Sequence, residues 1–274
     1  MAQITAADVN KLRQQTGAGM MDCRKALVES DGDIEKAIDY LRKKGQKVAA
    51  LRSDRETKEG VVIAKVNGDA SAGVILCLSC ETDFVAKNED FVNFAQTLTD
   101  LALTSGVKTL DELNATAFDG ATVADKVNEQ VAKIGEKVNL SKFERVEAAA
   151  VTAYIHGNYR MGVLVGFNNA VNEEVGKDVA MQIAAMNPLA IDADSVPAET
   201  IAREKEIAVE QVKAEGKPAE MAEKIAAGKV NKFLKENTLL AQAFVKDGNK
   251  SVADYLKSVG ADLKVTTFKR VALG

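Results

Sequence analysis

Apolar and polar positions alternate in two similar segments of the chain, residues 61–80 and residues 150–169, which align without a gap at an offset of 89. The first reads VVIAKVNGDASAGVILCLSC and the second reads AVTAYIHGNYRMGVLVGFNN. Each pattern predicts a β-hairpin, with a turn glycine at Gly68 in the first copy and at Gly157 in the second. Helical periodicity follows each hairpin, in FVNFAQTLTDLAL and in EEVGKDVAMQIAAM. The sequence therefore predicts a duplicated unit of one hairpin and one helix.

The connection between hairpin and helix is longer in the first copy. Matching Ala95 with Ala180 lowers the offset from 89 to 85, so the first copy carries four more residues there. This connection, residues 81–88, reads ETDFVAKN. A loop that is lengthened in only one copy of a duplicated scaffold is the first place where we expect a function.

The leading part of the chain predicts a small helical module and a linker. Residues 1–45 show three short helical patterns, with Thr5 and Asp33 placed to cap the first and the third. Gly45 suits the end of the third helix. Residues 46–59 are charged and have no strong period, which indicates a linker.

The remaining residues complete a fold of the α+β class. A run rich in Ala, Glu and Lys is broken at Gly216, Lys217 and Pro218, which predicts a helical hairpin. Residues 104–149 are expected to be mainly helical, and the last residues to form an extended stretch, a short helix and a strand. After the linker, the expected domains are core subdomain N at 60–149, core subdomain C at 150–194 and 237–274, and the inserted helical hairpin at 195–236.

Composition indicates a globular protein of the cytoplasm. The chain has 274 residues, of which 46% are hydrophobic and 28% are charged, and this length predicts about two to three domains. No apolar run approaches the roughly 18 residues that cross a bilayer, so we expect no membrane partner. The first residues lack the basic start and the apolar stretch of a signal peptide.

The charge distribution argues against nucleic acid as a direct partner. The net charge is −4, and it is uneven: residues 1–55 carry +3, which leaves −7 on the rest. A basic leading module on an acidic body favours docking onto a protein with an acidic patch. An ordinary solvated helical surface explains the same charges, and both readings stay open.

The residues of a catalytic or metal site are mostly missing. The chain has one histidine, His156, so a metal site with two histidines is excluded and a Ser-His-Asp triad is disfavoured. Cys77 and Cys80 have the spacing of a redox pair, but they fall on a predicted strand, where positions three apart face opposite sides. Buried packing is the favoured interpretation of both thiols. We therefore expect no enzyme, no cofactor and no bound metal.

Two features indicate contact with another protein. Asp83 and Phe84 form an acid–aromatic pair in the long connection, and the second copy has no such pair. Phe84 either contacts a partner or folds back as a lid, and Asp83 either caps the next helix or presents a carboxylate. Met20 and Met21 begin the second helix, where they either form an interface or divide between core and surface.

Four segments of the chain resemble one known family. They read ITAADVNKLRQQTGAGMMDCRKAL, DGDIEKAIDYLRKKG, ETDFVAKN and KVNKFLKENTLLAQAFV, and they occur in this order over nearly the whole chain. These segments are similar to those of the bacterial translation elongation factor Ts family. The resemblance implies a ubiquitin-associated-like (UBA-like) N-terminal module, two related core subdomains and a helical-hairpin insertion.

The resemblance also implies a function and a set of site residues. Members of the family promote guanine-nucleotide exchange on elongation factor Tu, a GTPase, by displacing magnesium and releasing GDP. Carried over by position, the N-terminal module docks through a first group of residues, a loop enters the partner's nucleotide site, and the core makes a further contact. The three sets are Arg13, Met20, Met21 and Arg24 for docking, Thr82, Asp83, Phe84 and Val85 for the loop, and His156 for the core.

Alternatives remain beside this interpretation. In the second interpretation, the chain is a non-exchanging protein–protein adaptor, which binds through its leading module and its helical arms. A redox enzyme that uses Cys77 and Cys80 is a third class. The arms themselves either form a homodimer or contact the partner. Arg24 stands where the family usually has a lysine, so a planar guanidinium replaces a point charge there.

Overall fold

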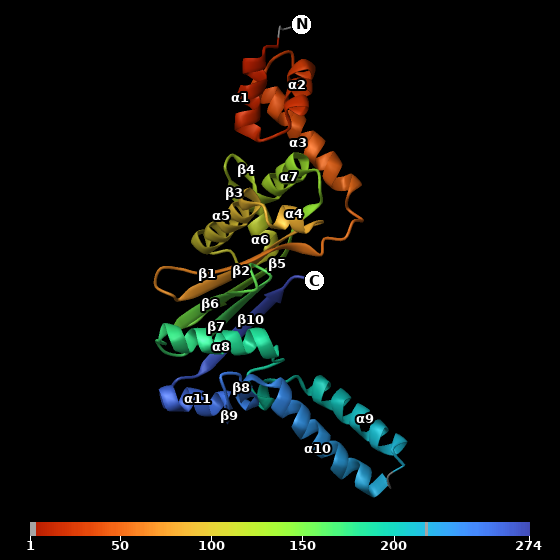
Figure 1. The fold of residues 1–274 in the computed structure, drawn as a ribbon, viewed down its shortest axis with the longest axis vertical. Coiled ribbons are helices and arrows are strands. Elements are labelled where there is room, and N and C mark those ends of the chain that lie inside the picture. The colour runs from red at the N-terminus through yellow and green to blue at the C-terminus, as the bar shows by residue number, and fades with distance from the viewer. Residues whose placement is uncertain (1–3, 217–218) are drawn as a thin grey trace.

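The computed structural model describes residues 4–216 and 219–274, and its elements lie along one long axis (Figure 1). The N-terminal helices lie at one end, two three-stranded sheets lie in the middle, and a helical hairpin projects at the other end. The predicted α+β class is therefore confirmed at the level of mixed helices and small sheets. Lys217 and Pro218, where the helical run was expected to be interrupted, lie outside the described residues, as do the first three residues of the leading module.

The three predicted N-terminal helices are confirmed as α1 (Ala6–Thr16), α2 (Met20–Glu29) and α3 (Ile34–Leu51). Thr5 caps α1 in a capping box with Asp8, and the Asp33 side chain accepts a hydrogen bond at the start of α3. The helices share an apolar core of their own. Its fully buried members are Leu12, Cys23, Ala26, Leu27 and Ala37.

The predicted end of α3 at Gly45 is wrong, because the helix continues to Leu51. Gly45 is buried against α7 (Val123–Ile134), where a Cβ atom would lie 2.9 Å from the carbonyl oxygen of Asn128. This glycine therefore allows two helices to approach closely. The first half of the predicted linker 46–59 is consequently helix, and only a short irregular segment precedes the first strand.

The first hairpin–helix copy is built as predicted and gains a third strand. Its hairpin is β1 (Glu59–Val66) and β2 (Ala72–Cys80), and its helix is α5 (Glu89–Ser105). The expectation that 104–149 is mainly helical is wrong in part, because β5 (Val138–Glu147) pairs antiparallel with β2. Between α5 and β5 lie α6 (Leu110–Ala115), β3 (Ala117–Phe118), β4 (Ala121–Thr122) and α7.

The second copy repeats this plan with its own third strand. The hairpin β6 (Ala150–His156) and β7 (Met161–Phe167) is followed by α8 (Glu173–Met186), and the closing strand β10 (Val265–Ala272) pairs antiparallel with β7. The predicted final helix and strand are confirmed as α11 (Val252–Val259) and β10. The smaller elements before β10 are η1 (Ala193–Ser195), η2 (Leu239–Ala241), β8 (Ala243–Phe244), β9 (Asp247–Ser251) and α11 (Val252–Val259).

The two sheets pack face to face, and helices cover their outer faces (Figure 1). A shared cluster joins Val62 and Ile75 of the first sheet to Leu164 of the second. The contact is close, because a Cβ on Gly73 would lie 2.8 Å from Cδ2 of Leu164. This packing joins the two copies through a third apolar cluster, which lies between the cluster beneath α5 and the cluster beneath α8.

The predicted helical hairpin is confirmed as α9 (Ala198–Ala214) and α10 (Ala219–Asn237). Small and branched apolar side chains form its seam, with Ala208, Val212 and Ala226 buried. Figure 1 shows both helices extending away from the sheets. Within the described residues, α9 and α10 pack mainly against each other.

Candidate functional site

The long connection of the first copy contains an extra turn of helix, α4 (Asp83–Ala86). In the second copy, the chain passes from β7 to α8 without a helix. The residues of α4 face two ways. Ala86 is buried and Val85 packs against the core beneath α5, whereas Phe84 is exposed. The lengthened loop thus has a fixed inner side and a free outer side.

Phe84 lies on the free side and is 84% exposed. The alternative in which it folds back as a lid is therefore wrong, although a hollow of about 300 Å³ between α4 and α7 adjoins it. Burial of a phenylalanine side chain is worth about 1.5–3 kcal/mol. A partner that covers Phe84 would gain free energy of this order.

Asp83 begins α4 and does not cap α5. Its carboxylate accepts a hydrogen bond from Nζ of Lys87 at 2.6 Å, and this bond lowers the pKa of Asp83. The cap of α5 is Asn88, whose side chain accepts from the N–H of Asp90. Asp83 therefore stays ionised and half-exposed beside Phe84, available to a partner group.

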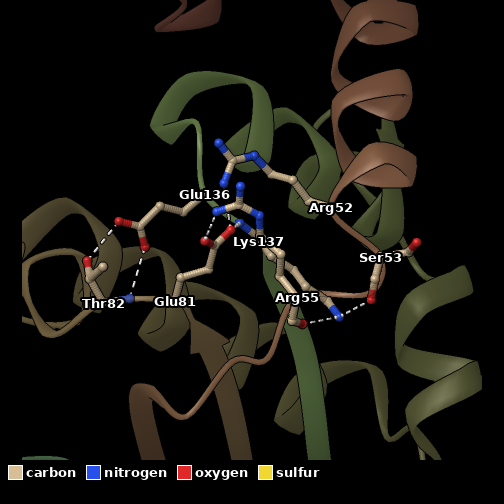
Figure 2. Close-up of polar contacts among 7 residues, drawn as sticks. All are labelled: Arg52, Ser53, Arg55, Glu81, Thr82, Glu136 and Lys137. Carbon is tan, nitrogen blue, oxygen red and sulfur yellow. Dashed lines mark hydrogen bonds and ion pairs between the residues drawn. The ribbon is translucent and has the colours of Figure 1, made fainter.

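Thr82 precedes α4, but its hydroxyl does not cap that helix. The side chain of Glu136, in the turn between α7 and β5, accepts from both the hydroxyl of Thr82 at 2.7 Å and its N–H at 3.0 Å. Figure 2 shows these two hydrogen bonds. The start of the loop is thereby fastened to the neighbouring turn.

Glu81, the residue before Thr82, is bound on three sides (Figure 2). Its side chain is 14% exposed and accepts from Arg52 at 2.7 Å and from Arg55 at 2.9 Å. The N–H of Lys137 donates to the same carboxylate at 2.6 Å. Burial alone raises the pKa of Glu81, but these hydrogen bonds outweigh burial and lower the pKa to about 2.

His156 ends β6 and is exposed. Its Nδ1 lies 3.0 Å from the hydroxyl of Tyr154, two residues earlier on the same face of the strand. The turn after His156 lies against the first copy, where the N–H of Val62 donates to the carbonyl of Tyr159. Gly157, Asn158 and Arg160 of this turn line a hollow of about 210 Å³ together with Asp83 and Lys87. The structure therefore brings the His156 turn next to the Asp83–Phe84 loop.

The expected docking residues lie on the N-terminal helices, separate from the loop. Met20 and Met21 are 54% and 74% exposed, so the alternative that buries one of them is wrong. With Arg24 and the start of α1 they line a groove of about 440 Å³. Arg13 is exposed but is not part of the groove lining.

The cysteines are poorly suited to redox chemistry. Cys77 faces the seam between the sheets and Cys80 faces the core beneath α5, on opposite sides of β2. Burial and the nearby charge of Glu136 raise the pKa of Cys80 to about 12. The thiolate form that a redox cysteine needs is therefore strongly disfavoured.

Within residues 4–216 and 219–274, no group of three or more His, Cys, Asp or Glu side chains is arranged to hold a metal ion. The helices in the same ranges include none that is both long and apolar enough to cross a membrane.

Comparison with known proteins gives matches over the full chain. The family model described as Elongation factor TS matches residues 81–274. An elongation factor Ts of Flavobacterium psychrophilum is 55% identical over 276 residues, which cover 100% of both chains. Those of Christiangramia forsetii and Amoebophilus asiaticus are 52% and 53% identical over at least 99% of each chain.

These matches define the class first: a translation elongation factor of the nucleotide-exchange type, at work in protein biosynthesis. Within that class, the chain belongs to the elongation factor Ts family. The resemblance seen in the sequence is confirmed.

The sequence reasoning missed the polar contacts behind the loop. Arg52 and Arg55 fell in the predicted linker, and Glu136 and Lys137 fell in a stretch expected to be mainly helical. One signal was present, because Val138 and Leu140 alternate with polar residues, as in a strand with one buried face, and both pack beneath α5. Recognition of that strand would have brought residues 136 and 137 beside the end of β2.

Proposed function

We propose that this chain is a cytoplasmic guanine-nucleotide exchange factor that binds GDP-bound elongation factor Tu, displaces its magnesium ion and promotes GDP release during elongation. Membership of the elongation factor Ts family supports the exchange role and the partner. The observation that carries the finer mechanism is Phe84, a largely exposed aromatic side chain on a loop whose base is fixed.

The loop would act by exclusion. Phe84 and Asp83, with Thr82 and Val85 beside them, would enter the region of the partner that holds magnesium and the phosphates. Magnesium supplies the main counter-charge to bound phosphates, so its loss weakens GDP binding. The coupling is reciprocal, because GDP with magnesium weakens the binding of the loop by the same factor.

The other exposed residues would supply affinity. The groove with Met20, Met21 and Arg24 on the UBA-like N-terminal module would dock on the GTPase domain, with Arg13 nearby on α1. His156 would contact a second domain of the partner from the core. These contacts recruit the factor and need no bond to be made or broken, so no catalytic residue is required.

The test is release of a fluorescent GDP analogue from elongation factor Tu of the same organism. Stoichiometric protein should raise the release rate, and Phe84→Ala should lower the maximal rate by at least about tenfold, since a lost contact of 1.4 kcal/mol changes a rate by that factor. Val28→Ala is a matched control, because Val28 is an exposed apolar residue of α2 away from the loop.

Each outcome has a clear meaning. An unchanged release rate with the natural protein would overturn the exchange function. Tight binding without faster release would favour the non-exchanging adaptor instead. A Phe84→Ala variant that works at full speed would overturn the role of the loop while leaving the exchange function in place.

A further inference from the structure

We propose that Glu81 and Glu136 are positioning residues. They hold the loop of residues 82–85, which we name the exchange loop, in a fixed orientation relative to the docking module, the N-terminal helices α1 to α3. Together with Arg52, Arg55, Thr82 and Lys137 they form a set of contacts that we name the clasp (Figure 2). This inference rests on the proposed function, because it assigns the clasp to the control of Phe84.

The clasp continues the ladder between β2 and β5 beyond the ends of both strands. The last paired residues of the ladder are Cys80 and Val138. The next pair in the same register, Glu81 with Lys137, is joined from side chain to backbone at 2.6 Å. The pair after it, Thr82 with Glu136, is joined at 2.7 and 3.0 Å. Side chains thus extend the pairing up to the residue that precedes α4.

A third segment joins the same contacts from the end of α3. Arg52 and Arg55 donate to the Glu81 carboxylate. Lys137 also bonds to this segment, because its Nζ donates to the carbonyl oxygens of Ser53 at 2.6 Å and Arg55 at 2.9 Å. The chain that leaves the docking module is therefore bonded to the base of the exchange loop.

The chemistry of the clasp favours a rigid connection. Hydrogen bonds with an ionised partner are roughly twice as strong as neutral ones. Removal of one partner from a largely buried charged pair leaves the other uncompensated. The base of the loop is therefore fixed, while the side chain of Phe84 stays exposed. A side chain on a fixed backbone loses less conformational entropy when a partner covers it.

The first experiment measures the motion of the loop without any partner. The chain contains no tryptophan, so Phe84→Trp supplies a single fluorescent reporter at the exposed position. In this background Glu81→Gln combined with Glu136→Gln should raise the amplitude of nanosecond anisotropy decay about twofold, as expected when a rigid backbone becomes flexible. Thr82→Val, which removes only the hydroxyl, gives a milder variant if the double substitution does not fold.

Asp178→Asn is the matched control. Asp178 is a buried carboxylate of α8 that pairs with Lys246 and accepts from the hydroxyl of Tyr255. Its substitution removes a buried charge in the second copy, so any general loss of stability is reproduced. The anisotropy decay of Phe84→Trp should stay unchanged in this control.

The second readout is GDP release. Glu81→Gln in the natural background should lower the maximal release rate about fivefold to tenfold and leave the half-maximal factor concentration within about twofold, since the docking groove is untouched. An unchanged anisotropy decay in the clasp variants would overturn the proposal. If the natural protein fails to release GDP, the proposed function falls, and the anisotropy decay alone decides whether the clasp holds the loop.

Discussion

Gly45 of α3 lies so close to Asn128 of α7 that a Cβ atom would approach the Asn128 carbonyl oxygen to 2.9 Å. We expect Gly45→Val to lower the free energy of unfolding by about 1–3 kcal/mol, because overpacking forces the helices apart. Gly228→Ala on α10, where a Cβ would meet nothing within 4 Å, should instead raise it by about 0.5–1 kcal/mol. Urea denaturation of both variants checks this contrast, and equal effects would show that Gly45 is not a packing residue.

Glu81 predicts a dependence of stability on pH. Its pKa is lowered from an ordinary value of 4.5 to about 2, so the ionised carboxylate stabilises the folded state above about pH 4.5. This stabilisation is lost as the pH falls from 4.5 towards 2. The difference in free energy of unfolding between the natural protein and Glu81→Gln should therefore be largest near neutral pH and shrink below pH 4.5. Urea denaturation at several pH values measures it, and a constant difference would count against the ionised contacts.

Phe84 and Phe91 provide a matched pair on the two sides of the loop. Phe84→Ala should change the free energy of unfolding by no more than about 0.5 kcal/mol, as is usual for exposed positions. Phe91 lies on the buried face of α5, so Phe91→Ala should cost about 3–5 kcal/mol. Thermal or urea unfolding separates the two. A large loss of stability in Phe84→Ala would mean that Phe84 supports the fold.

The methionines at the start of α2 predict an effect on affinity. Met21→Ala should raise the half-maximal factor concentration for GDP release about tenfold, the change that a contact of 1.4 kcal/mol produces, and leave the maximal rate unchanged. Val28→Ala, on the same helix but outside the groove lining, should change neither quantity. A fall in maximal rate for Met21→Ala would contradict the separation of docking from exchange.

The three thiols should resist modification in the folded protein. Cys23, Cys77 and Cys80 are all buried, and burial raises the pKa of both Cys23 and Cys80. A thiol reagent at pH 8 should react slowly without denaturant and with all three thiols in urea. Rapid labelling of Cys77 and Cys80 in the native protein would revive the redox alternative.

The elements with strong local signals could be predicted from the sequence. Thr5 and Asp33 cap their helices through side chains that contact the backbone three residues later, which is information within one turn. The two hairpin–helix copies were visible because each repeats the same alternation and each helix buries one face. The position of Phe84 on a connection that is longer in the first copy identified it as a candidate, but the choice between exposure and a lid depended on the structure.

The features that were missed depend on residues distant in the sequence. Gly45 has the same local surroundings as a helix-ending glycine, and only the position of Asn128 explains why α3 continues. The clasp depends on the register between β2 and β5, which no local pattern specifies. Arg52 and Arg55 are ordinary surface cations until Glu81 is placed beside them.

The length of α3 has a geometric consequence for the whole factor. An α-helix of 18 residues is about 27 Å long and turns about 100° with each residue. Since α3 begins in the docking module and ends at Leu51, directly before Arg52, its length sets the distance between the groove with Met20 and Met21 and the base of the exchange loop. A deletion or insertion of one residue within it would shift this spacing by about 1.5 Å and rotate the groove by about 100°. Members of the family that share this arrangement should therefore tolerate substitutions in α3 far better than changes in its length.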